Sequence, residues 1–350
     1  GLVFLALGCG YCLSGFFGGK LTHALGLGNL LWVSSGLVAV AMLLSGSAPG
    51  WPVFVAAAVV WGLGSGGIDA GLNAYVAAHF SARHVNWLHA CYSLGATLGP
   101  LVMTAVLVTA GTWRLGYHLV GAALLLMTAL FAVTRRRWDD PSPTSDAARP
   151  AGMGVALRNP RVGLQVVLFF VYVGLEFTVG QWAFTLLTEG RGLPADVAGV
   201  LAGGYYAAIG VGRVLAGVVA PRVGLDLMLR GSMLAVVAGA GLLCVGSPAW
   251  VGCVGLVVVG LGLAPVFPCL MARTPDRVGA DVAAHAVGFQ VSAGMLGAAV
   301  VPGLAGLLAD WRGLEFVARF AVVLGVVLFA AHEVLLALAP QSRPAAAGRL

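Results

Sequence analysis

Charged residues are scarce in this 350-residue sequence: Asp, Glu, Lys and Arg make up 9% of it, with a single lysine. Soluble domains carry about 25% charged residues, so this chain has too few to cover the surface of a soluble protein. With 60% hydrophobic residues and a mean hydropathy of +0.97, it is predicted to be a polytopic membrane protein whose main partner is the lipid bilayer.

The sequence also lacks the residue patterns of enzymes and pumps. It has no metal-ligand spacing, no nucleophile beside a base, and no G-x-x-x-x-G-K-[ST] for ATP. We therefore predict no enzymatic activity, no cofactor and no metal. Any energy for transport would come from an ion gradient, and the alternative is that no energy source is used. Cys9 and Cys12 have the spacing of a redox motif, but they lie in a continuous apolar run and are interpreted as packing residues.

What the chain does contain is a series of long apolar runs. Runs of about 20 apolar residues predict transmembrane helices, and the absence of a two-residue period argues against strands. We expect an all-α fold with eleven spans. They lie near residues 1–19, 29–47, 52–79, 85–110, 115–134, 162–187, 196–219, 227–246, 249–271, 283–308 and 314–339.

The basic residues lie mainly in alternate gaps between these runs, and basic loops face the cytoplasm. The net charge of +6 therefore indicates membrane orientation and not nucleic-acid binding. We predict a cytoplasmic C-terminus in an integral protein of a bacterial plasma membrane, functioning as a monomer. The basic gaps contain Lys20, Arg83, Arg135, Arg136, Arg137, Arg149, Arg158, Arg161, Arg222, Arg230, Arg273, Arg277, Arg343 and Arg349.

Internal repeats indicate two parallel halves. The segment VVWGLG at 59–64 recurs as VVVGLG at 257–262, with an offset of 198. Gly19 and Gly26 match Gly217 and Gly224 with the same offset, and LGATLGP at 94–100 matches LGAAVVP at 296–302. Since five spans precede the polar segment at 135–161 and six follow it, the first half is expected to lack its own first span.

Two six-helix halves of the same orientation, joined by a cytoplasmic linker, resemble the major facilitator superfamily. The resemblance implies four regions. Residues 1–134 form the N-terminal half without its first span, 135–161 the cytoplasmic linker, 162–339 the C-terminal six-helix half, and 340–350 a cytoplasmic tail. The loop motif of that family, G-x-x-x-D-R-x-G-R-R, is partly kept: His23 and Ala24 stand where an acidic and a basic residue are expected, and Pro221 stands at the acidic position of the second copy.

The stretch GLGSGGIDAGLN at 62–73 contains a G-x-G-x-x-G, but no strand precedes it, so its glycines are interpreted as a helix-packing surface. Asp69 within it is costly in a bilayer and should face a wet cavity or a partner. Ser65, Asp69 and Asn73 recur every four residues and would form one polar stripe. The stripe predicts a substrate or proton site; the alternative is a polar lock between two helices.

Other candidates lie in three further spans. Glu176, followed by Gln181, could bind a substrate hydroxyl or carry a proton, or could simply bond to a backbone carbonyl. His89 is a candidate gate or proton-linked residue, or a hydrogen-bonded interfacial histidine. Gln290 is a candidate cavity donor. Arg213 is expected to extend to the cytoplasmic face.

The glycines followed by Asp69 and Asn73 resemble the fucose/glucose/galactose proton symporters, as does APVFP at 264–268. That group has Glu and Asn-Pro where this chain has Asp69 and Asn73-Ala74. The resemblance implies proton-coupled uptake of a small polar solute, a sugar. Two alternatives stay open at this point: proton-coupled efflux of a drug or metabolite, and a non-transporting receptor or scaffold on the same fold.

Overall fold

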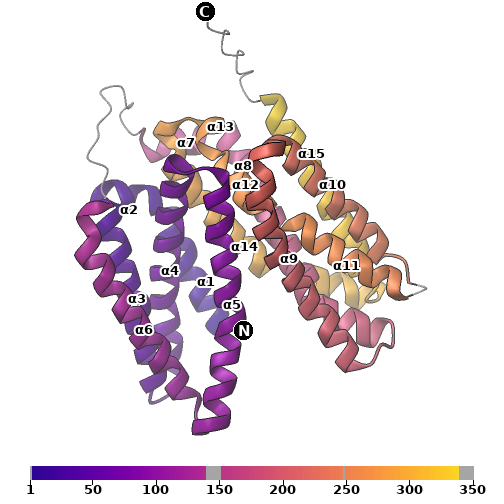
Figure 1. Ribbon diagram of the computed structural model, residues 1–350, viewed down its shortest axis with the longest axis horizontal. Coiled ribbons are helices and arrows are strands. Elements are labelled where there is room, and N and C mark those ends of the chain that lie inside the picture. The colour runs from indigo at the N-terminus through magenta and orange to yellow at the C-terminus, as the bar shows by residue number, and fades with distance from the viewer. Residues whose placement is uncertain (1, 139–150, 247–248, 339–350) are drawn as a thin grey trace, which may run out of the picture.

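The computed structural model describes residues 2–138, 151–246 and 249–338, and within them the chain is almost entirely helical with no strand. Residues 2–138 contain helices α1 to α6, and residues 151–246 and 249–338 contain α7 to α15 (Figure 1). Their bounds are α1 Leu2–Phe16, α2 Gly18–Leu25, α3 Leu27–Ser47, α4 Trp51–His79, α5 Ala82–Ala110, α6 Trp113–Thr134, α7 Met153–Arg158, α8 Pro160–Thr185, α9 Ala195–Val223, α10 Leu225–Leu243, α11 Ala249–Leu263, α12 Val266–Ala272, α13 Thr274–Val278, α14 Ala280–Arg312 and α15 Phe316–Leu338.

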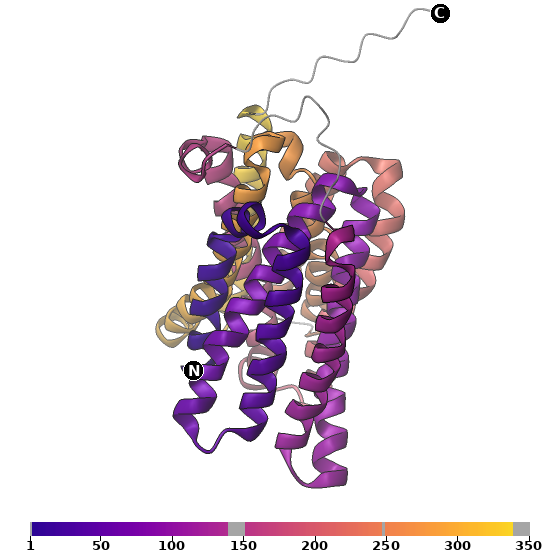
Figure 2. The same cartoon turned by 90° about the vertical axis from the view of Figure 1, so that its left-hand side faces the viewer.

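The helices form two bundles. Helices α1–α6, the N-terminal bundle, lie on one side in Figure 1, and α8–α15, the C-terminal bundle, lie on the other. Figure 2 shows the N-terminal bundle from its own side, where α3 packs against both α4 and α6. The bundles touch through α1 with α14, α5 with α9, and α4 and α5 with α12.

Nine helices of the described residues are long and apolar enough to cross a membrane, or ten if α1 and α2, bent by 58°, count as one span. One predicted span, 85–110, folds as α5, which is 29 residues long but is not among those nine helices. Of the predicted linker, residues 139–150 lie outside the described residues, as does the predicted tail at 340–350. The all-helical membrane fold is confirmed, and the number of spans is approximate.

The two ends of the molecule differ in chemistry. The basic end carries α2, α7 and α13 (Figure 1), with Lys20, Arg158 and Arg277 on those helices. At the opposite end of the N-terminal bundle, the Phe54 ring packs between two tryptophans. Its centroid lies 5.8 Å from that of Trp51 and 5.8 Å from that of Trp113. Aromatic rings of this kind collect at membrane–water interfaces, and basic residues collect on the cytoplasmic side.

The repeated glycines pack equivalent helices in the two bundles. A β-carbon at Gly62 would lie 2.0 Å from the backbone oxygen of Leu7 on α1, and one at Gly260 would lie 2.7 Å from that of Tyr205 on α9. Two residues later, a β-carbon at Gly64 would lie 2.5 Å from a backbone oxygen of α3, and one at Gly262 would lie 2.9 Å from one of α10. Backbone contact this close is possible only at glycine, so the prediction of a packing surface is confirmed.

The close approach of α4 and α1 predicts the effect of a single methyl group. Gly62→Ala should lower the free energy of unfolding by about 1–3 kcal/mol, because its β-carbon would overlap the backbone of α1. Thermal unfolding in detergent would measure the change. Gly8→Ala on α1 is the matched control, because a β-carbon there meets nothing within 4 Å. Equal stability of the two variants would contradict the packing described.

Candidate functional site

Asp69 is the centre of a hydrogen-bonded chain that joins three helices of the N-terminal bundle. The Tyr11 hydroxyl of α1 donates to Asp69 Oδ2, and Asn73 Nδ2 donates to Asp69 Oδ1 at 2.7 Å. His89 Nε2 of α5 lies 3.1 Å from Asn73 Oδ1. Since the Asn73 amide nitrogen is the donor to Asp69, its oxygen accepts, and His89 donates from Nε2. We call this set, Tyr11, Asp69, Asn73 and His89, the Asp69 chain.

The carboxylate of Asp69 has neutral partners only. Both of its oxygens accept hydrogen bonds, and among residues 2–138, 151–246 and 249–338 no lysine or arginine forms an ion pair with it. Asp69 is half-buried, whereas Asn73 is 1% exposed. A carboxylate held this way can change its protonation state without releasing a cationic partner, which suits a group that loads and releases a proton.

Glu176 is the centre of a second cluster, in the C-terminal bundle. The Tyr172 hydroxyl donates to Glu176 Oε2, and Arg213 Nη2 lies 3.6 Å from the same oxygen. The Tyr205 hydroxyl donates to the Glu176 backbone oxygen at 2.9 Å. Arg213 is 5% exposed, so its charge and that of Glu176 balance each other inside the protein. We call Tyr172, Glu176, Tyr205 and Arg213 the Glu176 cluster.

The expectation that Arg213 extends to the cytoplasmic face is wrong. Helix α9 continues ten residues beyond it to Val223, a rise of about 15 Å. An arginine side chain cannot span that depth, so it turns inward and pairs with Glu176. The pair was not predicted from the sequence because the two residues lie on different helices. The presence of two oppositely charged residues in apolar spans could have indicated it, since charges within a membrane usually pair with one another.

Helix α5 connects the two groups across the bundle interface. Ser93 lies one turn after His89 on the same face of α5, and its hydroxyl donates to the His89 backbone oxygen at 3.1 Å. Arg213 Nη1 donates to Ser93 Oγ at 2.8 Å. On the other side of His89, the Phe267 ring of α12 lies 4.6 Å from the imidazole. Polar groups therefore run from Tyr11 in one bundle to Tyr172 in the other, on five helices.

The two predicted glutamines lie apart from this path. Gln181 is exposed on α8. Gln290 is fully buried, and its Nε2 donates to Gln165 Oε1 at 2.7 Å and to Thr274 Oγ1 at 3.1 Å. The Gln165–Gln290–Thr274 contacts tie α8, α14 and α13 together, and they do not share a hydrogen bond with either Asp69 or Glu176.

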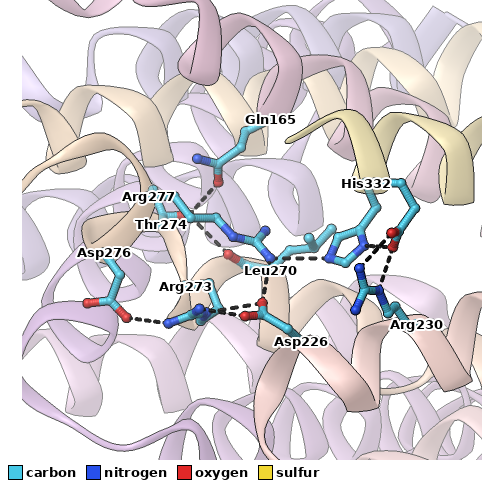
Figure 3. A network of polar contacts seen from close by, with 10 residues as sticks. Gln165, Asp226, Arg230, Leu270, Arg273, Thr274, Asp276, Arg277 and His332 are labelled. Atoms are coloured by element: carbon cyan, nitrogen blue, oxygen red, sulfur yellow. Dashed lines mark hydrogen bonds and ion pairs between the residues drawn. The ribbon is translucent and has the colours of Figure 1, made fainter. Parts of the chain in front are cut away.

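Arg273, which precedes Thr274 in the sequence, belongs to a charged network at the basic end that the sequence did not predict (Figure 3). Asp226 of α10 accepts from Arg273 Nη2 at 2.6 Å and from Arg277 Nη2 at 3.0 Å. Arg277 Nη2 also lies 3.2 Å from His332 Nε2. The hydrogen bond to Asp226 raises the pKa of Arg273, whereas burial lowers the pKa of Arg277.

This network fixes the connection between α12 and α14. Arg273 contacts Asp226, and its Nη1 also donates to Asp276 at 2.9 Å (Figure 3). Nearby, Arg230 forms a bidentate hydrogen bond with the carboxylate of Glu333. It lies in the half of the chain where the loop motif has Pro221 at the acidic position. The acidic residue that holds the arginines is Asp226, five positions later. Within the described residues, no three His, Cys, Asp or Glu side chains are grouped so that they could hold a metal ion.

Known proteins share both sequence and fold with this chain. The profile of the Major Facilitator Superfamily matches residues 1–289 and 182–349. "Bypass of stop codon protein 6" of Saccharomyces cerevisiae is 23% identical over 354 residues, covering 90% of this chain and 70% of the yeast protein. The fosmidomycin resistance protein of Escherichia coli is 26% identical over 241 residues, covering 66% of this chain and 57% of its own length.

A solved structure shares the arrangement of the helices. The fucose:proton symporter of E. coli superimposes with a TM-score of 0.82 at 16% identity, covering 96% of this chain and 90% of the symporter chain. At this identity the likeness concerns the fold.

The Arg213–Glu176 pair predicts that replacing Arg213 alone lowers the free energy of unfolding more than replacing both residues does. Arg213→Met should lower the free energy of unfolding by about 3–5 kcal/mol, because it leaves a buried carboxylate unpaired. Adding Glu176→Gln should restore part of the loss. Chemical unfolding in detergent would measure both variants.

The exposed pair Arg230–Glu333 provides the control, since its side chains are 46% and 34% exposed. Arg230→Gln should change stability far less than Arg213→Met does, because solvent screens an exposed ion pair. If Arg213→Met were as mild as Arg230→Gln, the ion pair would not be the stabilising contact inferred.

Proposed function

Because the chain belongs to the Major Facilitator Superfamily, a family of membrane transporters and not of enzymes, we propose that it moves a small polar solute, a sugar, by proton-coupled alternating access. In this proposal the Asp69 chain carries the proton and the space between the two bundles holds the solute. The solute and the lipid bilayer are the partners, the proton gradient supplies the energy, and no cofactor takes part.

The single observation that carries the proposal is the setting of Asp69. Its carboxylate is half-buried in a membrane helix and accepts hydrogen bonds from Tyr11 and Asn73. A group that exchanges a proton must be reachable from the aqueous side and close to the solute it couples to. The partial exposure of Asp69 supports the first condition, and the Asn73–His89 contact, which links α4 to α5, supports the second.

Several hydroxyl and amide groups at the interface support a solute rich in hydroxyls. Tyr92 of α5 is 68% exposed and Tyr206 of α9 is 50% exposed, and each lies next in sequence to a residue of the polar path, Ser93 or Tyr205. Phenol rings offer an apolar face with a polar tip, which suits a sugar ring with its hydroxyl edge. Gln181, exposed on α8, is proposed as a further amide for solute binding.

Contacts between the bundles support a mechanism of alternating access. Arg213 of the C-terminal bundle donates to Ser93 of the N-terminal bundle, so rocking of the bundles would break or form this bond. The same movement would alter the ion pair between Arg213 and Glu176. We further propose that the basic end faces the cytoplasm of a bacterium, in accord with the excess of arginine there, and that the transporter works as a monomer.

A second candidate function is proton-coupled efflux of a drug or metabolite. It is favoured by the similarity to the fosmidomycin resistance protein, of whose length this chain spans 57%. The same Asp69 chain would then exchange a proton against the outgoing compound. The direction of solute movement under a pH gradient separates the two functions.

Symport through Asp69 predicts a specific transport defect. In proteoliposomes with an imposed gradient of one pH unit, one-to-one coupling supports up to about tenfold accumulation of a labelled sugar. Asp69→Asn should reduce accumulation to the external concentration while still exchanging labelled for unlabelled sugar. Labelled fucose, glucose and galactose are the probes.

Glu189→Gln is the control, since it removes an exposed carboxylate at the end of the π-helical turn Leu186–Gly190 and should transport as the parent protein does. Accumulation that survives Asp69→Asn would rule out Asp69 as the proton carrier. Gradient-driven expulsion of fosmidomycin or a dye, without sugar uptake, would replace the first function by the second.

A further inference from the structure

A cavity of about 430 Å³ lies between the two bundles near the basic end, away from the polar path just described. It is lined by Arg83 at the start of α5 and by residues from the last two turns of α9, including Arg222. One arginine therefore comes from each bundle. The remaining lining residues are Gly217, Val218 and Pro221.

Trp87 of α5 contacts two of the residues that line this cavity, Arg83 and Gly217. The guanidinium of Arg83 lies over the Trp87 ring, 4.2 Å from its centroid, which holds the cation beside the indole. A β-carbon at Gly217 would lie 2.7 Å from Trp87 Nε1, so glycine lets the indole of α5 approach the backbone of α9. The arginine is thus held against the neighbouring bundle by defined contacts.

Neither cavity arginine is neutralised within the described residues. Arg83 contacts the Trp87 ring, and Arg222 Nη1 donates to the backbone oxygen of Val218 at 3.1 Å, but no carboxylate pairs with either one there. Asp226, one turn after Arg222, is already held by Arg273 and Arg277. Two uncompensated guanidinium groups facing one cavity create a site for an anion, and guanidinium groups bind phosphate oxygens in pairs.

The surface next to the cavity favours a lipid over a free anion. Helix α9 presents an exposed apolar face that leads away from the cavity toward the membrane interior, with Val211 56%, Leu215 54% and Val218 46% exposed. A headgroup in the cavity would leave its acyl chains against that face. Basic pockets between membrane helices on the cytoplasmic side bind anionic headgroups in this way.

We propose that Arg83 and Arg222 bind the headgroup phosphate of an anionic phospholipid, which bridges the N-terminal and C-terminal bundles at the basic end. Because the arginines come from different bundles, the bridged form requires α5 and α9 to be packed together there. The lipid would therefore stabilise the arrangement in which this end is closed. This site is separate from the solute site, and its binding test does not require that a solute be known.

The test is native mass spectrometry of the full-length chain in detergent, with phosphatidylglycerol and phosphatidylcholine of the same acyl chains as probes. Phosphatidylglycerol should bind more tightly. Arg83→Gln and Arg222→Gln should each weaken phosphatidylglycerol binding about fivefold. The double variant should bind phosphatidylglycerol more weakly than either single variant, whereas phosphatidylcholine binding should not change in any of the three. Arg83→Lys and Arg222→Lys should lose less affinity than the glutamine variants, because the charge remains while the paired N–H donors of the guanidinium are lost.

Arg158→Gln is the matched control, because Arg158 is an exposed arginine on α7 at the same end. This variant should bind phosphatidylglycerol as the parent chain does. Equal binding by the double variant, or an equal loss in Arg158→Gln, would overturn the site. Displacement of the lipid by millimolar inorganic phosphate would overturn the lipid assignment in favour of a free phosphate. The thermal unfolding temperature of the double variant is compared with that of the parent chain. Equal values show that weaker lipid binding does not result from unfolding.

Discussion

Backbone contact between α4 and α1 is the constraint on which the position of Asp69 and its hydrogen bonds depends. Gly62 and Gly66 leave no space for a side chain, since β-carbons there would lie 2.0 and 2.3 Å from backbone oxygens of α1. In a bilayer, where apolar helices gain little by leaving lipid, such close approach of small residues is a main source of helix association. It also brings the Tyr11 hydroxyl within reach of Asp69, which lies one turn after the glycines.

The charges inside the membrane are arranged so that each has a partner. Asp69 is held by neutral donors, while Glu176 and Arg213 hold each other. Isolated charges are costly at this depth, which explains why nearly all remaining ionised groups lie at the two ends. Ser93 joins the two arrangements across the bundle interface, because its hydroxyl contacts both the His89 backbone oxygen and Arg213.

Local spacing predicted part of the candidate site. Asp69 and Asn73, four residues apart on one helix, do contact each other, as the expected polar stripe requires. Tyr11 and Arg213 were not predicted as partners, because their contacts depend on how helices pack and not on spacing within one helix. Whether Gln181, Gln290 and His89 contribute to transport stays a prediction, although His89 bonds to Asn73 and Gln290 to Gln165.

The sequence by itself determined the membrane setting, the helical class and the two-fold repeat, because these follow from composition and from patterns within single helices. Scarce charge, long apolar runs and glycines repeated at an offset of 198 were sufficient. Only the tertiary structure decided which polar groups meet: Tyr11 with Asp69, Arg213 with Glu176, and Arg83 near Arg222. Those pairs lie 58, 37 and 139 positions apart, and helix packing alone brings such distant residues together.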